Sequence, residues 1–224
     1  GDPETDCAII TAIREAVGDR VDIFPDINQG YKNPKQAIAA IRAMQKFGIC
    51  GVEQPLEGRR PMARVTEAVD VIVWTDEGVW TPYDAMEVVR QQSADAISIY
   101  YTKSGGLQRA MEIGVIAATA GMPVNLNGAL ETGVGNAGNL HLIAALRGEV
   151  KPNVIPVTTL KGREVCKVGA VFYTDDIITE PFAYADGFLT IPDKPGLGIE
   201  LDMDKIEKYR VALSVRRLEA ACLT

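Results

Sequence analysis

The sequence has few cysteines, almost no histidine and no long hydrophobic run. Its four cysteines are scattered and form no Cys-x-x-Cys pair, so zinc and dithiol redox motifs are not indicated. No apolar run approaches the roughly 20 residues that a bilayer-spanning helix needs. Basic residues are not in excess either, because the net charge is −7. Nucleic acids and anionic membranes are therefore poor partners, and a cytoplasmic protein with reduced thiols is expected.

What the sequence does contain is a repeating unit. Hydrophobic residues make up 47% of the 224 positions, which is enough for one sizeable core. A short apolar run, a polar tip and an amphipathic helix follow one another several times, which predicts βαβ crossovers and a parallel sheet. The predicted strands lie within residues 20–26, 50–55, 70–77, 96–103 and 122–128. The predicted helices cover about residues 34–47, 61–69, 82–91, 105–121 and 134–146.

The polar tips of four successive units indicate the type of α/β fold. Asp26, Glu53, Asp76 and Tyr100 lie at the expected carboxyl ends of the strands, 27, 23 and 24 residues apart. A doubly wound sheet gathers its ligands at one switch point, whereas a TIM-type barrel builds its site from the carboxyl ends of all its strands. No Gly-x-Gly-x-x-Gly motif follows the first strand, which counts against a dinucleotide fold. The sequence therefore predicts a TIM-type barrel.

Three of these tips are acidic. Carboxylates at the ends of adjacent parallel strands would repel one another and raise each other's pKa values. A divalent cation removes that conflict, and ligation by carboxylate oxygens alone favours Mg²⁺, with Mn²⁺ as the other choice. Asp26, Glu53 and Asp76 are therefore the candidate metal ligands. The alternative is that each acid caps the helix or turn that follows it.

The two ends of the chain differ from its middle. "GDPETDCAIITAIREAVG" predicts a helix from its first turn, capped by Thr5 or Asp6, and we expect an amino-terminal part to be missing from the chain. "DGFLTIPDKPGLGIELD" is rich in proline and glycine and lacks the repeating unit. We therefore divide the chain into a partial barrel domain, residues 1–186, and a carboxyl-terminal segment, residues 187–224, that packs back on the barrel or on a capping domain.

Five motifs, in order, resemble those of a known family. "PDINQGY", "GVEQPL", "TDEGVW", "TKSGGL" and "PGLGIELD" are similar to the enolase superfamily, and within it to the muconate-lactonizing, or muconate cycloisomerase, subgroup. The resemblance implies a modified (β/α)₇β barrel with an α+β capping domain. It also implies one essential Mg²⁺ at the positions of Asp26, Glu53 and Asp76, which stabilises the charge formed when a proton α to the carboxylate of a small acid is removed. Because many members assemble as octamers or dimers, a homo-oligomer is expected.

The chain departs from the subgroup at both catalytic bases. The Lys-x-Lys pair of the second barrel strand would precede Gly1, so it is absent, together with the first strand and most of the capping domain. The usual second lysine is replaced by Tyr100, which is either a weak acid or base or a hydrogen-bonding residue of the pocket. Lys103 is the other catalytic candidate, although strand alternation predicts that it points away from Tyr100.

Four polar residues near the strand ends are candidate substrate contacts: Asn28, Gln54, Asn127 and Glu131. The alternative for Glu131 is a cap of the next helix. His141, the single histidine, lies between leucines in a helical pattern, which is typical of a packed helix residue. No histidine follows the predicted strand at 122–128, and this disfavours the mandelate-racemase subgroup.

The resulting hypothesis is an enzyme that needs Mg²⁺ and acts on a small carboxylic acid. Dehydration of a hydroxylated amino acid of the hydroxyproline type comes first, because one base is enough for elimination. Racemisation or epimerisation of an amino-acid derivative is the alternative, followed by cycloisomerisation. A hypothesis of another class is an incomplete, non-catalytic fragment that binds metal.

Overall fold

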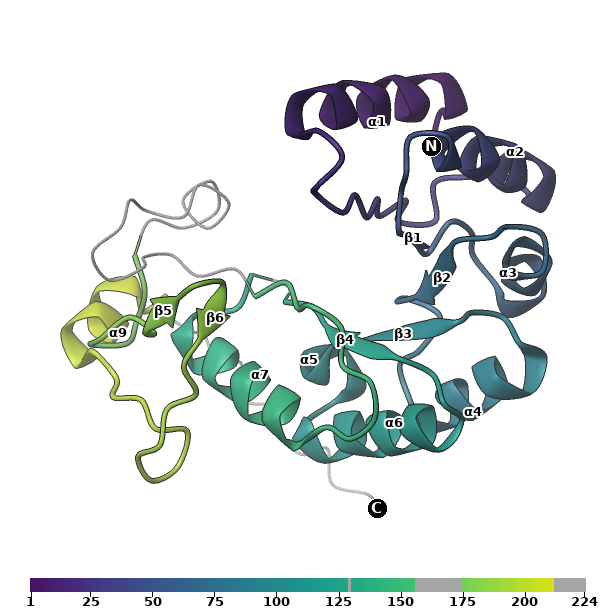
Figure 1. Ribbon diagram of the computed structural model, residues 1–224. Coiled ribbons are helices and arrows are strands. Elements are labelled where there is room, and N and C mark those ends of the chain that lie inside the picture. Colours follow the sequence, from purple (N-terminus) through teal and green to yellow (C-terminus); the bar gives the residue numbers. More distant parts are fainter. Residues whose placement is uncertain (129, 156–174, 212–224) are drawn as a thin grey trace, which may run out of the picture.

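The computed structural model describes residues 1–128, 130–155 and 175–211, and its centre is a parallel sheet (Figure 1). The four strands pair in sequence order, so each helical connection crosses to the neighbouring position in the sheet. The strands are β1 (Gly51–Glu53), β2 (Ile72–Thr75), β3 (Ala96–Ile99) and β4 (Val124–Leu126). This order is that of consecutive βα units in a barrel wall.

The sheet continues on both sides through single bridges. Ile23 and Asp26 pair in parallel with Ile49 and Glu53, so the predicted first strand is extended but contacts β1 at two points only. Pro25 lies between these points, and a proline has no N–H to donate to a ladder. On the other side the segment 150–154 pairs with β4, which the sequence did not predict. Across the described ranges the series does not close on itself.

The longer helices cover the convex side of the arc of strands (Figure 1). They are α1 (Pro3–Val17), α2 (Pro34–Gln45), α3 (Arg59–Thr66), α4 (Pro82–Gln91), α6 (Leu107–Thr119) and α7 (Gly133–Ala145). The short α5 (Tyr101–Ser104) follows β3 at its carboxyl end, and α9 (Met203–Tyr209) lies to one side of the arc. The predicted strand at 96–103 is wrong beyond Ile99. The carbonyl of Tyr100 accepts the Ser104 N–H, so the chain coils into α5. No described helix is long and apolar enough to cross a membrane.

Helix α1 is fixed at both ends by side chains. Its cap is Asp2 and neither Thr5 nor Asp6, because Asp2 Oδ2 accepts the Thr5 N–H at 3.1 Å and Pro3 begins the helix. Near the other end, the Arg14 guanidinium donates to four backbone carbonyls, those of Gly18, Val21, Phe47 and Gly48. These carbonyls precede Ile23 and Ile49, so Arg14 ties together the amino ends of two neighbouring extended segments.

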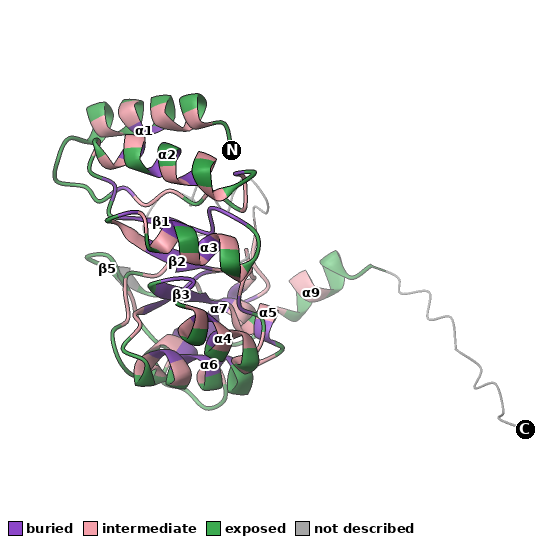
Figure 2. Cartoon of the chain, turned by 90° about the vertical axis from the view of Figure 1, so that its right-hand side faces the viewer, coloured by how far each residue is buried: buried purple, intermediate pink, exposed green. Residues whose placement is uncertain are grey.

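Burial is concentrated in the sheet and on the inner faces of the helices (Figure 2). Every residue of β1, β3 and β4 is buried, as expected for parallel strands covered on both faces. Trp74 in β2 is also buried, and its ring packs edge-on against Phe24, with centroids 5.7 Å apart. The polar residues at the carboxyl ends therefore stand on a rigid support.

Helix α7 presents two glycines to Tyr101. The Tyr101 hydroxyl donates to the Gly135 carbonyl at 3.2 Å, and a Cβ added at Gly138 would lie 3.2 Å from the ring. His141 is half-buried in the same helix, with Nε2 3.1 Å from the Leu197 carbonyl, which confirms a packed helix residue.

The carboxyl-terminal part forms a small hairpin of β5 (Tyr184–Ala185) and β6 (Phe188–Leu189). Leu189, Leu197 and Ile199 pack against a cluster that includes Ala137 and Leu140 of α7. The predicted division between residues 186 and 187 falls in the turn of this hairpin and stays a prediction. Cysteines 166 and 222 lie outside the described residues, while Cys7 and Cys50 are free thiols.

Candidate active site

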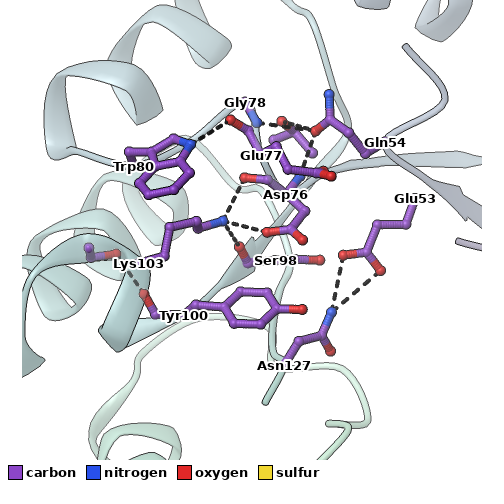
Figure 3. Close-up of polar contacts among 12 residues, drawn as sticks. Glu53, Gln54, Asp76, Glu77, Gly78, Trp80, Ser98, Tyr100, Lys103 and Asn127 are labelled. Carbon is purple, nitrogen blue, oxygen red and sulfur yellow. Dashed lines mark hydrogen bonds and ion pairs between the residues drawn. The ribbon is translucent and has the colours of Figure 1, made fainter. Parts of the chain in front are cut away.

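The register of the sheet brings the polar tips to one edge. Asp26 pairs with Glu53, and Glu53 pairs with Trp74, two residues before Asp76. On the next strands Ser98 pairs with Asn125, so Tyr100 and Asn127 follow at the same level. Residues two apart on a strand share a face. The carboxyl ends of β1 to β4 therefore contribute to one polar centre (Figure 3), and the bridge between Asp26 and Glu53 adds the segment before β1.

Glu53 is the most deeply buried acid of this centre, with 2% of its surface exposed. Burial raises its pKa to about 7, and the charges of Asp26 and Asp76 act in the same direction. The Asn127 amide donates from Nδ2 to Oε1 at 3.1 Å and to Oε2 at 3.4 Å. Asn125 donates in turn to Asn127 Oδ1 at 3.4 Å, so a short amide chain orients the Glu53 carboxyl.

The other two acids have their own hydrogen-bond donors. Asp26 is exposed and accepts two hydrogen bonds from Asn28, one from the backbone N–H at 2.9 Å and one from the side-chain amide. Asn28 has a positive φ of 47°, which turns the chain back. Burial raises the pKa of Asp76, and Lys103 acts against that rise. Among the described residues, no three Asp, Glu, His or Cys side chains are grouped closely enough to hold a metal ion. The proposed ligand set therefore stays a prediction.

Lys103 lies inside the centre, and the prediction that it points away is wrong. Its ammonium group forms an ion pair with the Asp76 carboxylate and also donates to the carbonyls of Asp76, at 2.6 Å, and Ser98, at 3.4 Å. Alternation failed because the strand ends at Ile99, and the turn of α5 carries Lys103 back over the sheet edge. Both partners are nearly enclosed, with 10% and 13% of the Lys103 and Asp76 side chains exposed.

Tyr100, which directly follows β3, faces the same centre. Figure 3 shows its hydroxyl pointing toward Asn127 and Glu53, and the Lys103 ammonium lies 4.9 Å from the centre of its ring. Burial raises the pKa of this phenol far above its ordinary value, and the negative charges of Asp76 and Glu53 raise it further. The Tyr100 hydroxyl therefore keeps its proton at neutral pH.

Gln54 was predicted to contact the substrate, but its side chain is turned into the protein. It is 1% exposed, and both atoms of its carboxamide are bonded within the protein. Glu131 does not cap α7 either, because Thr132 is the cap residue, but it accepts a hydrogen bond from Thr102 at 3.5 Å. Asn28, Asn127 and Glu131 stay predicted substrate contacts.

The oxygen atoms of Asp26, Glu53 and Asp76 suit a hard divalent cation, although these side chains are not grouped closely enough to hold one. Three carboxylates rise from adjacent segments. The charges of Asp26 and Asp76 raise the pKa of Glu53, and that of Asp76 raises the pKa of Asp26, a conflict that a bound Mg²⁺ or Mn²⁺ would relieve. All the candidate ligand atoms are oxygens, which softer metals do not prefer. The chemistry of the residues present therefore fits such an ion, because a carboxylate that accepts a hydrogen bond keeps further lone pairs for a cation.

Comparison with known proteins places the chain in a family. Residues 1–205 match the model of the "Enolase C-terminal domain-like" family. The chain belongs to this family. It is also 31% identical over 210 residues to muconate cycloisomerase 1 of Rhodococcus opacus, covering 93% of this chain and 53% of that protein. The L-Ala-D/L-Glu epimerase of Bacillus subtilis (strain 168) is 34% identical over 202 residues, 88% of this chain and 51% of that protein.

Solved structures agree with this membership of the enolase C-terminal domain-like family. The muconate lactonizing enzyme from Pseudomonas putida aligns with a TM-score of 0.82 at 26% identity, covering 93% of this chain and 55% of that one. The fold is therefore the barrel of that family, as the resemblance implied. The chain spans about half the length of the curated relatives that it matches.

Proposed function

We propose that the protein that contains this chain removes the proton α to the carboxylate of a small acid, with a divalent cation held by Asp26, Glu53 and Asp76. The observation that carries the proposal is the convergence of these acids on one sheet edge, where Glu53 is enclosed with two further negative charges nearby. The family and the names of two relatives, an epimerase and a cycloisomerase, support the same class of chemistry.

The residues of this chain have separable roles in that reaction. Bound Mg²⁺ or Mn²⁺ would supply positive charge against the charge that develops on the substrate carboxylate. Asn127 orients the Glu53 carboxyl through its Nδ2, and Lys103 holds Asp76 through its ammonium group. Tyr100 presents a protonated hydroxyl to the centre. Asn28 and Glu131 line the edge and are proposed to contact the substrate.

Elimination is the reaction that these roles favour. The Lys103 ammonium is engaged by Asp76 and two carbonyls, so it is not available as a base on this face. Tyr100 can donate the proton from its hydroxyl oxygen to a departing hydroxyl group, which would leave as water. We therefore propose dehydration of a hydroxylated amino acid, with the α-proton taken from the opposite face by a group outside the described residues.

Epimerisation or racemisation of an amino-acid derivative is the second candidate. It is favoured by the 34% identity to L-Ala-D/L-Glu epimerase, and cycloisomerisation by the similarity to muconate cycloisomerase 1. In the former case Tyr100 would have to return a proton to the face opposite the one from which it was taken. A chain that binds a cation and turns nothing over is the remaining possibility.

Solvent-deuterium exchange distinguishes these reactions. Each enantiomer of a substrate that is turned over is incubated with the protein in ²H₂O, and deuterium at the α-carbon is followed by NMR. We expect elimination, with exchange into one enantiomer only. Rapid exchange into both enantiomers would show two working faces and would make racemisation the function. A protein that binds Mn²⁺ but exchanges no α-proton in a panel of hydroxylated amino acids and N-acyl amino acids would contradict the proposal.

A further inference from the structure

Gln54 follows Glu53 directly and connects the three acid-bearing tips through its backbone. Its N–H donates to the Trp74 carbonyl at 3.0 Å, and its own carbonyl accepts the Gln29 N–H at 2.7 Å. Gln29 belongs to the loop after Asp26, and Trp74 to the strand before Asp76. Gln54 holds this position with a backbone φ of 33°, a value that residues other than glycine rarely adopt. Such a conformation persists only where the surroundings impose it.

The side chain of Gln54 holds the loop that carries Asp76. Its Oε1 accepts the N–H groups of Asp76, at 2.8 Å, and Gly78, at 3.2 Å, and the Thr75 hydroxyl at 3.1 Å (Figure 3). Its Nε2 donates to the Leu56 carbonyl at 2.7 Å. A carboxamide is the neutral group that offers an acceptor and a donor at this reach. The bonds to Thr75 and Leu56 are buried and the other two are part-buried, and a buried donor left without a partner costs about 1–3 kcal/mol.

Gly78 shows how closely the loop follows the carboxamide. A Cβ added at Gly78 would collide with the Thr75 hydroxyl, and it would stand 3.6 Å from Gln54 Oε1. A larger residue would therefore push the loop away from the oxygen that holds Asp76. The loop and the carboxamide fit as one unit.

We propose that Gln54 is a positioning residue that fixes the relative places of Asp26, Glu53 and Asp76 and so sets the affinity of the site for a divalent cation, without touching the cation or the substrate. The inference rests on the proposed function, because it assigns these acids to the cation. Its physical basis is that a shift of one carboxylate relative to the others is felt by a cation that demands near-ideal ligand geometry. Partners that orient metal ligands commonly change metal affinity by about 10–100-fold when they are removed.

Mn²⁺ alone is the probe, and free Mn²⁺ is measured by its EPR signal during titration of the protein that contains this chain. Wild-type protein should bind one Mn²⁺. Gln54→Met keeps the length of the side chain but removes the acceptor and the donor, and we expect about 10–100-fold weaker binding. Gln54→Glu keeps an acceptor at the same reach, so it should recover most of the affinity. Equal losses in the Met and Glu variants would overturn the role of the acceptor.

Asp95→Ala is the matched control. Asp95 Oδ2 accepts the Val73 N–H at 2.8 Å, so this side chain holds the opposite end of the same strand β2. The variant should lose folding stability and leave Mn²⁺ affinity unchanged. Equal weakening in Asp95→Ala and Gln54→Met would reduce Gln54 to a general stabilising residue and refute the inference.

Two further outcomes separate the inference from the proposed function. Should wild-type protein bind no Mn²⁺, the proposed function fails, and the inference with it. Should wild-type protein bind one Mn²⁺ and Gln54→Met bind it equally well, only the inference fails. If Gln54→Met does not fold, Gly78→Ala takes its place, because it moves the loop and leaves Gln54 intact. Weaker binding by about tenfold is expected, and unchanged binding would contradict the inference.

Discussion

Charged side chains lie at both ends of the parallel strands, but they bond differently. At the amino ends, Arg14 donates to four backbone carbonyls and Asp95 accepts the Val73 N–H. At the carboxyl ends, Asp76 bonds to the Lys103 ammonium, and the buried Glu53 has Asp26 and Asp76 as charged neighbours. At the amino ends, charged side chains bond to backbone groups. At the carboxyl ends, charged side chains lie next to other charged side chains.

This difference separates the stabilising end of the molecule from its reactive end. A charge that bonds only to backbone groups completes the secondary structure, so its loss should change stability alone. A charge that faces other charges affects their protonation and the binding of cations. Its loss should therefore change these properties as well as stability. The substitutions below test this separation.

Lys103→Met should have the largest effect on stability. It leaves Asp76 enclosed without its counter-ion, and removing one member of a buried pair typically costs about 3–5 kcal/mol. The measurement is urea unfolding with a chelator present at pH 8. Arg90→Met is the control, because Arg90 pairs with Glu87 with 69% of its side chain exposed, and its loss should change stability far less. Equal costs for the two variants would contradict the comparison.

Glu53→Gln should stabilise the metal-free protein, and only at higher pH. The pKa of Glu53 is raised from 4.5 to about 7 in the folded state, so folding favours the protonated form. The contribution of Glu53 to the stability of the wild type is therefore fully present below pH 4.5 and is lost as pH rises through 7. Glutamine cannot ionise, so the variant should gain about 3 kcal/mol over wild type at pH 8 and almost nothing at pH 4.

Urea unfolding at the two pH values, again with a chelator, measures this difference. Glu87→Gln serves as the control, since it removes an acid whose pKa is lowered by Arg90, and it should bring no gain at pH 8. A gain for Glu53→Gln that is the same at pH 4 and pH 8 would show that charge is not its cause.

Tyr100→Phe should lower kcat by about 10²-fold, or ~2.7 kcal/mol, and leave stability nearly unchanged. The variant removes the hydroxyl that faces Asn127 and Glu53 and keeps the ring under Lys103. The neighbouring Tyr101→Phe is the control, because the Tyr101 hydroxyl bonds to Gly135 of α7. A kcat that falls equally in both variants would deny Tyr100 a direct part in the reaction.

Arg14→Lys should have the smallest effect of the four. A lysine keeps the charge but cannot reach four carbonyls with the geometry of a guanidinium, so a loss of about 2 kcal/mol is expected. Thermal unfolding measures the loss, and Mn²⁺ titration should show no change in affinity. A change in affinity would link the two ends of the strands and break the distinction between them.

The sequence was sufficient to predict the sheet and the edge on which the acids lie. Apolar runs that end in Asp26, Glu53 and Asp76 have the spacing of βα units, and the spacing alone predicts parallel strands. The lengths of the strands were harder to predict, because the extent of a strand depends on hydrogen bonds to the neighbouring strands. Pro25 interrupts one predicted strand, and the segment 150–154 pairs with β4 without a clear apolar pattern of its own.

The directions of side chains were predicted less well than the positions of residues. Lys103 was misplaced because periodicity does not show where β3 gives way to the turn of α5. Gln54 was assigned to the substrate because an amide beside a predicted ligand is polar, and polarity alone does not reveal burial. Its four partners come from residues 56 to 78, which only the folded chain brings together.

Tyr100 and Tyr101 are neighbours in the chain, but Tyr100 points to the polar centre, whereas the Tyr101 hydroxyl donates to Gly135 of α7. Any residue larger than glycine at position 138 must displace the Tyr101 ring, because its Cβ would stand 3.2 Å from it. The backbone that moves with Tyr101 also carries Tyr100. A replacement at Gly138, on a helix outside the polar centre, should therefore shift Tyr100 without altering any residue of that centre.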